Sequence, residues 1–164
     1  MCTSSDRREA RKKALRLLEH MDRTEKGLLE KLKKAGFTQE AAEDAVTYVK
    51  SFGYLNDLRY ASYYISARIH SKSRQKIFQE LLGKGVGLST IQAAWEEQEE
   101  LEEPDERTII KKEIEKKYQP GILLEEKQMR RLYGYLARRG FKSGDIFSVL
   151  EELHITWEPK TEDL

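Results

Sequence analysis

Residue types that could catalyse a reaction or bind a metal are sparse in this sequence. Its three histidines are far apart and Cys2 is the only cysteine, so a Cys/His zinc site has no ligand set. The glycines at Gly83 to Gly87 lack the spacing of a phosphate-binding loop, and the acidic run from Glu96 to Asp105 lacks the alternating ligands of a calcium loop. A helix stop and a solvated helix end are simpler interpretations. The sequence therefore predicts a protein that is not an enzyme, with no catalytic residue, metal site or cofactor.

Basic residues are the better candidates for contact with a partner. The net charge is only +1, yet Lys and Arg are concentrated in Arg7 to Lys34, Arg59 to Lys84 and Arg107 to Lys142. Acidic residues are concentrated in Glu96 to Glu106 and after Gly144. Such segregation can create a basic face in a protein of near-neutral charge. On the residues alone, ordinary solvated helix faces explain these runs slightly better.

The candidate contact residues fall into two groups. One crowds a joint between two predicted helices and is expected to be exposed, and the other precedes three glycines that recur along the chain. The first group is Arg68, Lys72, Arg74 and Lys76, and the second is Lys33, Lys34, Lys84, Arg138 and Arg139. Equivalent basic corners would form a row suited to a polymeric anion or to a filament with acidic patches. Basic residues also favour helix C-termini through the helix dipole, and both explanations can hold.

The recurring glycines are Gly36, Gly85 and Gly140, and the pattern around them predicts the fold. Leucine or isoleucine lies eight and four residues before each glycine, and Phe or Val directly follows it. Such matches indicate a tandem repeat of roughly 50 residues. The predicted fold is all-α, an elongated tandem array of three three-helix repeats at residues 7–53, 54–101 and 104–154. An acidic C-terminal tail at 155–164 follows, and from Trp157 onward it is expected to be frayed.

The stretch from Gly53 to Ala61 ends one predicted helix and starts the next. Gly53 can adopt the left-handed conformation that closes a helix, and Asn56 or Asp57 can cap the helix that follows. Several tyrosines cluster around this joint, where half-buried packing is a more common role than stacking on unpaired bases. Trp95 falls at an apolar position of the repeat and is expected in the core.

This stretch resembles the Gly-Tyr-Leu-Asp-Asp-x-Arg-Phe-Ala signature of the RecX family, bacterial regulators of the RecA recombinase. Asn56 replaces the first Asp and Tyr60 replaces the Phe. The resemblance continues through Arg74 to Val86 and Tyr135 to Phe141, and covers nearly the whole chain from about Ala14 to about Leu153. It implies tandem three-helix repeats and a non-enzymatic role in DNA repair and recombination.

The resemblance also implies the partners. A RecX protein binds along the groove of the RecA–DNA filament and hinders ATP turnover, strand exchange and filament extension. Single-stranded DNA, within or outside the filament, is a second candidate partner. Among the signature residues, Tyr54 and Arg59 are the ones that we assign to an interface. A monomer is expected.

Two other functions fit the same helices: a free-standing helix-turn-helix nucleic-acid binder and a passive helical scaffold. The first requires a base-reading helix with matched Arg, Asn or Gln positions, and none is evident.

The single cysteine predicts a reducing cytoplasm. No apolar run is long enough to cross a bilayer, and the amino terminus has no signal-peptide pattern, so no membrane association is expected.

Overall fold

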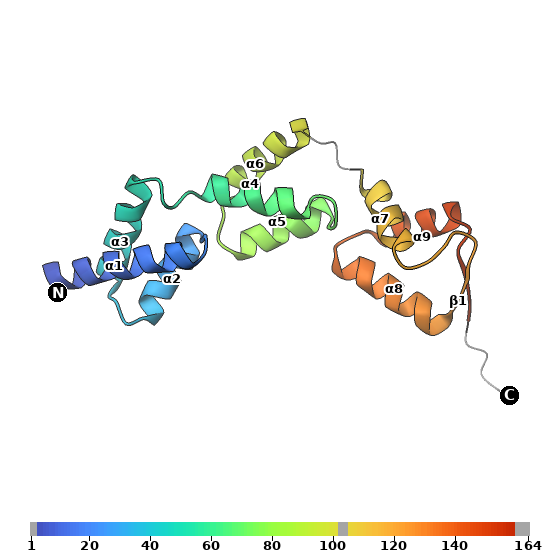
Figure 1. Cartoon of the computed structure of the whole chain (residues 1–164), viewed down its shortest axis with the longest axis horizontal. Coiled ribbons are helices and arrows are strands. Elements are labelled where there is room, and N and C mark those ends of the chain that lie inside the picture. Colours follow the sequence, from blue (N-terminus) through green and yellow to red (C-terminus); the bar gives the residue numbers. More distant parts are fainter. Residues whose placement is uncertain (1–2, 102–104, 160–164) are drawn as a thin grey trace. The chain divides into compact units, whose positions relative to one another are not determined.

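The computed structural model describes residues 3–101 and 105–159, and most of these residues lie in helices (Figure 1). The helices are α1 (Ser4–His20), α2 (Glu25–Lys34), α3 (Gln39–Ser51), α4 (Asp57–Arg68), α5 (Arg74–Gly83), α6 (Leu88–Leu101), α7 (Glu106–Glu115), α8 (Glu126–Arg138) and α9 (Ser143–Glu152), and the strands are β1 (Leu123–Glu125) and β2 (Thr156–Glu158). The predicted all-α fold of three-helix repeats is confirmed for these ranges. Cys2 and Pro104, where the third repeat was predicted to begin, lie outside them.

The helices belong to two compact units, which are described separately. The first unit holds the chain up to Ser66 together with Phe78–Glu100, and so contains the first repeat and most of the second. The second unit holds Ala67–Ile77 and the chain from Leu101 onward, and so contains the third repeat with the turn between α4 and α5.

The core of the first repeat is built around small residues. Ala10 and Ala14 lie one turn apart on α1, which packs mainly along α3, where Ala42 and Ala45 are also buried. Without long side chains between them, the two helices can approach closely. The leucines of α2, Leu28 and Leu32 among them, complete this core, which is typical of a thin three-helix unit.

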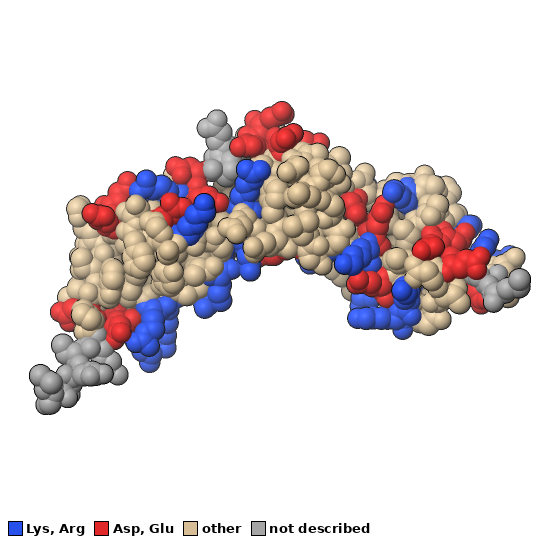
Figure 2. Space-filling model, turned by 180° about the vertical axis from the view of Figure 1, so that it is seen from behind, with Lys and Arg blue, Asp and Glu red and all other residues tan. Residues whose placement is uncertain are grey.

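The second repeat buries Trp95, as the repeat pattern predicted. Trp95 is only 3% exposed, and its ring meets the edge of Phe78 with 5.7 Å between ring centroids. Ile91 and Ala94 of the same helix, α6, are fully buried. The apolar face of α6 therefore points into the repeat, and its acidic residues remain on the outside. Figure 2 shows acidic side chains gathered over the end of α6.

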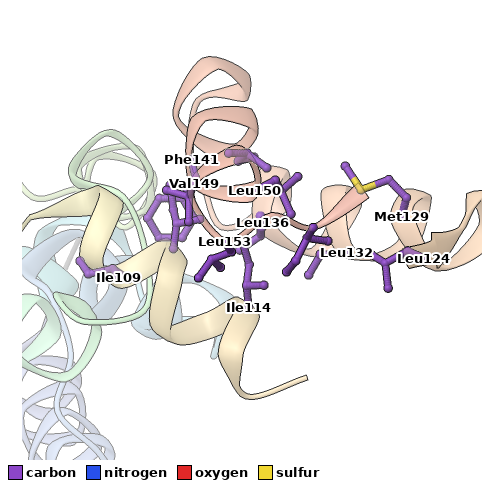
Figure 3. Close-up of a cluster of buried hydrophobic side chains, with 13 residues drawn as sticks. Ile109, Ile114, Leu124, Met129, Leu132, Leu136, Phe141, Val149, Leu150 and Leu153 are labelled. Atoms are coloured by element: carbon purple, nitrogen blue, oxygen red, sulfur yellow. The ribbon is translucent and has the colours of Figure 1, made fainter. Parts of the chain in front are cut away.

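The third repeat has the larger branched side chains in its core (Figure 3). Figure 3 shows residues from α7, α8 and α9 converging between the helices, with Ile114, Leu136 and Leu150 among them. All three of these side chains are almost completely buried. Burying each stabilises the fold by roughly 1.5–3 kcal/mol relative to an exposed side chain.

The third repeat also contains a short parallel strand pair, which the sequence analysis did not predict. Strand β1 pairs with β2 so that Leu124 is opposite Trp157. Ile155, just before β2, is buried, and His154 turns the chain toward β1 with a φ of 55°. The prediction of a frayed tail from Trp157 onward is therefore wrong at Trp157 and Glu158, because Ile155 is anchored in the core and the strand that follows it is paired.

Candidate functional site

The recurring glycines end the second helix of each repeat in the same way. Gly36, Gly85 and Gly140 have φ values of 100°, 91° and 89°, the left-handed conformation that was predicted for a helix stop. The residue after each glycine donates its N–H back to the carbonyl of the leucine four residues before the glycine. Phe or Val at that position also supplies the apolar contact that accompanies this type of helix end.

The first of two joints between repeats forms where the N-terminus of α2 meets the second repeat. Thr24 caps α2 by accepting the N–H of Gly27 at 3.0 Å, and its hydroxyl donates to the carbonyl of Lys84 at 2.7 Å. The next backbone N–H, that of Glu25, donates to the Asp57 carboxylate at 2.9 Å. The signature aspartate therefore binds the helix of the preceding repeat.

The second joint has the same design, between the N-terminus of α5 and the third repeat. The N–H of Ser73, at the position of Thr24, donates to the carbonyl of Arg139 at 3.0 Å. The N–H of Arg74 donates to the Glu106 carboxylate at 2.8 Å. In both joints a carboxylate at the start of one repeat accepts a free N–H from the second helix of the repeat before it, which is favourable at a helix N-terminus.

Asn56 and Asp57 therefore have different roles, which the sequence left open. The Asn56 side chain accepts the N–H of Arg59 at 3.0 Å and is the cap of α4. The Asp57 side chain turns to the joint instead. Burial there raises the pKa of the Asp57 carboxyl above its ordinary value, and the hydrogen bond from the N–H of Glu25 opposes this shift in part.

Replacing Asp57 tests the joint. Asp57→Ala is expected to lower the free energy of unfolding by about 0.5–2 kcal/mol, the usual cost of losing an acceptor at a helix N-terminus. Asp57→Asn, which keeps an acceptor oxygen, should cost clearly less. Chemical denaturation of both variants measures the difference, and equal losses would contradict the role of Asp57 as an acceptor.

The same variants should differ in their pH dependence. Because the pKa of Asp57 is higher in the folded than in the unfolded state, the folded state holds this proton more tightly. The contribution of Asp57 to stability is thus greatest below its unfolded pKa and falls as the pH rises through the raised folded value. Asp57→Asn should lack this decrease.

The first group of predicted contact residues is less exposed than expected. Arg74 is exposed, but Arg68, Lys72 and Lys76 are half-buried, so the predicted exposure is wrong for three of the four. Lys76 shows the reason. A Cβ atom placed on Gly140 would lie 2.4 Å from the Cβ of Lys76, so the stem of this lysine packs against the joint.

Two of the three basic corners also lie at the joints. At the first joint the carbonyl of Lys84 accepts the hydroxyl of Thr24. The Nζ of Lys84 lies 5.7 Å from the centre of the Tyr64 ring. Arg139 donates from Nη1 to the carbonyl of Ser71 at 3.2 Å. Lys33, Lys34, Lys84 and Arg138 are exposed, and Arg139 is half-buried. Figure 2 shows basic side chains gathered over α8 on the face that it draws. Whether these residues contact a partner stays a prediction.

Arg139 belongs to a small network in the third repeat. Its guanidinium lies 4.4 Å from the centre of the Tyr135 ring, and the Nζ of Lys117 lies 3.7 Å from the same ring. The Tyr135 hydroxyl donates to the buried carboxylate of Glu113 at 2.8 Å. Burial raises the pKa of Glu113, but hydrogen bonds from Lys116 and Tyr135 outweigh it and leave the pKa below its ordinary value. This network holds the half-buried side chain of Arg139 against the third repeat.

A hollowed surface of the first unit lies beside the signature stretch. A groove of about 660 Å³ runs between α1 and the end of α3. Its lining residues are Leu15, Leu18, Glu19, Asp22, Tyr48, Phe52, Gly53, Tyr54 and Arg59. The signature residues Tyr54 and Arg59, which the sequence assigned to an interface, are thus brought together here.

Aromatic rings form one wall of this groove. Phe52 and Tyr54 are 58% and 54% exposed, and their rings stack with 6.0 Å between centroids. Tyr48 meets the edge of Phe52 at 5.1 Å. Arg59 donates from Nη1 to the carbonyl of Gly53 at 3.0 Å, which holds the turn that carries Tyr54. Sequence reasoning missed Phe52, although a large aromatic residue directly before a helix-ending glycine was a usable signal.

A second groove of about 410 Å³ continues along α1 toward its N-terminus and shares Leu15 and Tyr48 with the first. Its basic residues are Arg7, Arg8, Arg11 and Lys12. Arg11 forms two hydrogen bonds to the Asp44 carboxylate at 2.8 and 3.0 Å, and its guanidinium lies 4.3 Å from the centre of the Tyr48 ring.

Within residues 3–101 and 105–159, no three His, Cys, Asp or Glu side chains come together as a possible metal site. None of the helices in these ranges is long and apolar enough to cross a membrane.

Family models match the chain three times, in sequence order. They are described as the first, second and third three-helix domains of RecX and match residues 10–48, 56–94 and 105–150. These matches correspond to the three repeats.

Individual proteins give the same result. A protein from Caldanaerobacter subterraneus subsp. tengcongensis, named Regulatory protein RecX, is 34% identical over 144 residues, which cover 87% of this chain and 70% of that protein. One of the same name from Streptomyces coelicolor is 31% identical over 147 residues, which cover 88% and 77%.

Solved structures share the fold. The crystal structure of RecX from Lactobacillus salivarius has a TM-score of 0.67 at 18% identity, covering 92% of this chain and 98% of that one. Another crystal structure, of a regulatory protein RecX, has a TM-score of 0.65 at 25% identity, covering 90% and 72%. The resemblance inferred from the signature is confirmed, and the chain belongs to the RecX family of regulatory proteins.

Proposed function

We propose that this protein binds RecA filaments formed on single-stranded DNA and slows their ATP hydrolysis, strand exchange and extension. The observation that carries the proposal is the ordered match of all three RecX domains to the three repeats. A role in regulation follows from the family, and RecA as its target is the proposal. We place this activity in the cytoplasm, where RecA acts on DNA.

The architecture supports a binding role. Three similar repeats are connected by two joints of one design, with a carboxylate at the start of each later repeat accepting an N–H from the repeat before. A filament offers the same surface on successive protomers. A chain of linked repeats can engage several such surfaces, and its total affinity then exceeds that of any one contact.

The proposal predicts that the protein slows ATP turnover by preformed RecA–single-stranded-DNA filaments while hydrolysing no ATP itself. The measurement is the rate of ATP hydrolysis by RecA from the matching organism, against increasing concentrations of this protein. Unchanged turnover with a correctly folded protein would reject RecA regulation. Binding to bare single-stranded DNA without an effect on RecA would favour the helix-turn-helix alternative.

Charge reversal at the exposed corner of the first repeat refines this test. Reversing Lys33 and Lys34 should weaken inhibition partially, because an array loses affinity stepwise as its contacts are removed. Folding should be nearly unaffected, since exposed substitutions usually change stability by no more than about 0.5 kcal/mol. Added salt should have a similar effect if these contacts are ionic.

A further inference from the structure

The two grooves along α1 form one trough in the first unit. They share Leu15 and Tyr48, so the surface continues from the start of α1 to its end. We propose that this trough docks an extended segment of the RecA surface that carries an acidic residue, then apolar residues, then a basic residue. This inference rests on the proposed function and names the surface that performs it.

The length of the trough sets the length of the segment. Arg8 lines the basic groove and Glu19 lines the aromatic groove, both on α1. At 1.5 Å per helical residue, these two positions are about 16 Å apart along the helix axis. An extended chain advances about 3.3 Å per residue, so about five residues of the partner span this distance.

The middle of the trough is apolar and unusually open to solvent. Phe52 and Tyr54 together expose most of two aromatic side chains, beside Leu15 and Leu18 of α1. Exposed aromatic rings that stack on each other are already held in position, so little conformational entropy is lost when a partner covers them. Buried aromatic anchors are also the residues that contribute most at protein interfaces.

The two ends of the trough carry opposite charges. At the start of α1, Arg8 has no carboxylate within ion-pair distance among the described residues, and Lys12 has only an exposed contact with Glu9 at 3.6 Å. At the other end, Glu19 and Asp22 outnumber the one cation that lines this groove, Arg59, whose Nη1 donates to the carbonyl of Gly53, and neither carboxylate forms an ion pair with a described cation. Complementary charges on the segment would fix its direction and register.

These charges favour a polypeptide over a nucleic acid. The phosphates of single-stranded DNA would be attracted by Arg8 but repelled by the carboxylates of Glu19 and Asp22. Arg7 and Arg11 do not restore the balance, because they already form ion pairs with Glu40 and Asp44. A segment with one acidic and one basic end satisfies both ends of the trough.

The experiment titrates labelled protein with RecA–single-stranded-DNA filaments held by a non-hydrolysable ATP analogue, and separately with the bare DNA. Phe52→Ala with Tyr54→Ala should weaken filament binding about tenfold or more, as expected when aromatic anchors are removed. The matched control is Tyr63→Ala. Tyr63 is 67% exposed on α4 of the same unit but does not line the trough, so binding should change less than twofold.

Neutralising the two carboxylates of the trough shows whether a polypeptide or a nucleic acid occupies it, because the two occupants predict opposite changes in affinity. Glu19→Gln with Asp22→Asn should weaken filament binding about threefold, and neutralising Glu30, exposed on α2, should not. If nucleic acid occupies the trough, the same double substitution should instead tighten binding to bare DNA, and this result would overturn the inference.

The remaining outcomes separate the two proposals. Unfolding curves for every variant show whether it is folded, and both aromatic side chains are exposed enough for truncation to leave the core intact. If the parent binds filaments and the double aromatic variant binds equally well, the trough is not the docking site and the proposed function stands. If the parent does not bind filaments, both proposals are rejected.

Discussion

Replacing Trp95 by alanine is expected to lower the free energy of unfolding by about 3–5 kcal/mol, the usual cost of truncating a buried tryptophan. Trp95 is 3% exposed and contacts Phe78 edge to face, so its removal leaves a cavity between α5 and α6. Urea denaturation followed by circular dichroism measures the loss.

Trp157→Ala is the matched control for this substitution. Trp157 is 40% exposed on β2, with its ring 5.9 Å from that of Phe147. Because much of this side chain is already in water, its truncation should cost clearly less than that of Trp95. If Trp95→Ala unfolds at the same denaturant concentration as the parent, the assignment of Trp95 to the core is wrong.

The second large effect is expected at Gly140, in the joint between the second and third repeats. A Cβ atom there would lie 2.3 Å from the Ser73 Oγ and 2.4 Å from the Lys76 Cβ. Gly140 also has a φ of 89°, which costs a residue with a side chain roughly 1–2 kcal/mol. Gly140→Ala should therefore lower the free energy of unfolding by this conformational cost and by about 1–3 kcal/mol more, because the added methyl group overpacks the joint.

Gly36→Ala is the control that measures the cost of the left-handed conformation without the steric clash. Its φ is 100°, and no atom lies within 4 Å of the position that its Cβ would occupy. Gly36→Ala should thus lower the free energy of unfolding by only about 1–2 kcal/mol. The difference between the two variants in thermal or urea unfolding measures the steric tightness of the joint. Equal losses would show that Ser73 and Lys76 move aside freely.

Local sequence determined the helices and their ends. Apolar residues at helical spacing and a glycine after each second helix were sufficient to predict three-helix repeats, because helix periodicity and left-handed helix ends depend on neighbouring residues. The prediction that Trp95 is buried was correct for the same reason, since its position repeats an apolar position of the other units. The family resemblance could likewise be recognised from the signature alone.

Tertiary structure decided what the polar residues do. The sequence showed two possible caps at the start of α4, and only the packing of repeats assigns Asn56 to the cap and Asp57 to the preceding repeat. Sequence also placed Lys76 among exposed basic residues, whereas packing against Gly140 covers its stem. Such roles depend on residues some 30 to 65 positions away, which no local pattern contains.

The trough and the strand pair also depend on segments that are far apart in the sequence, so local patterns could not predict them. Tyr54 and Arg59 could be selected from the signature, but α1, which forms the opposite wall, lies more than 30 residues earlier. Strand β2 has only three residues and pairs with a segment on the other side of two helices. The sequence by itself determined which segments are helical and where they stop, because those choices are local. Only the tertiary structure decided which side chains join repeats and which form a surface for a partner, because those depend on contacts between distant segments.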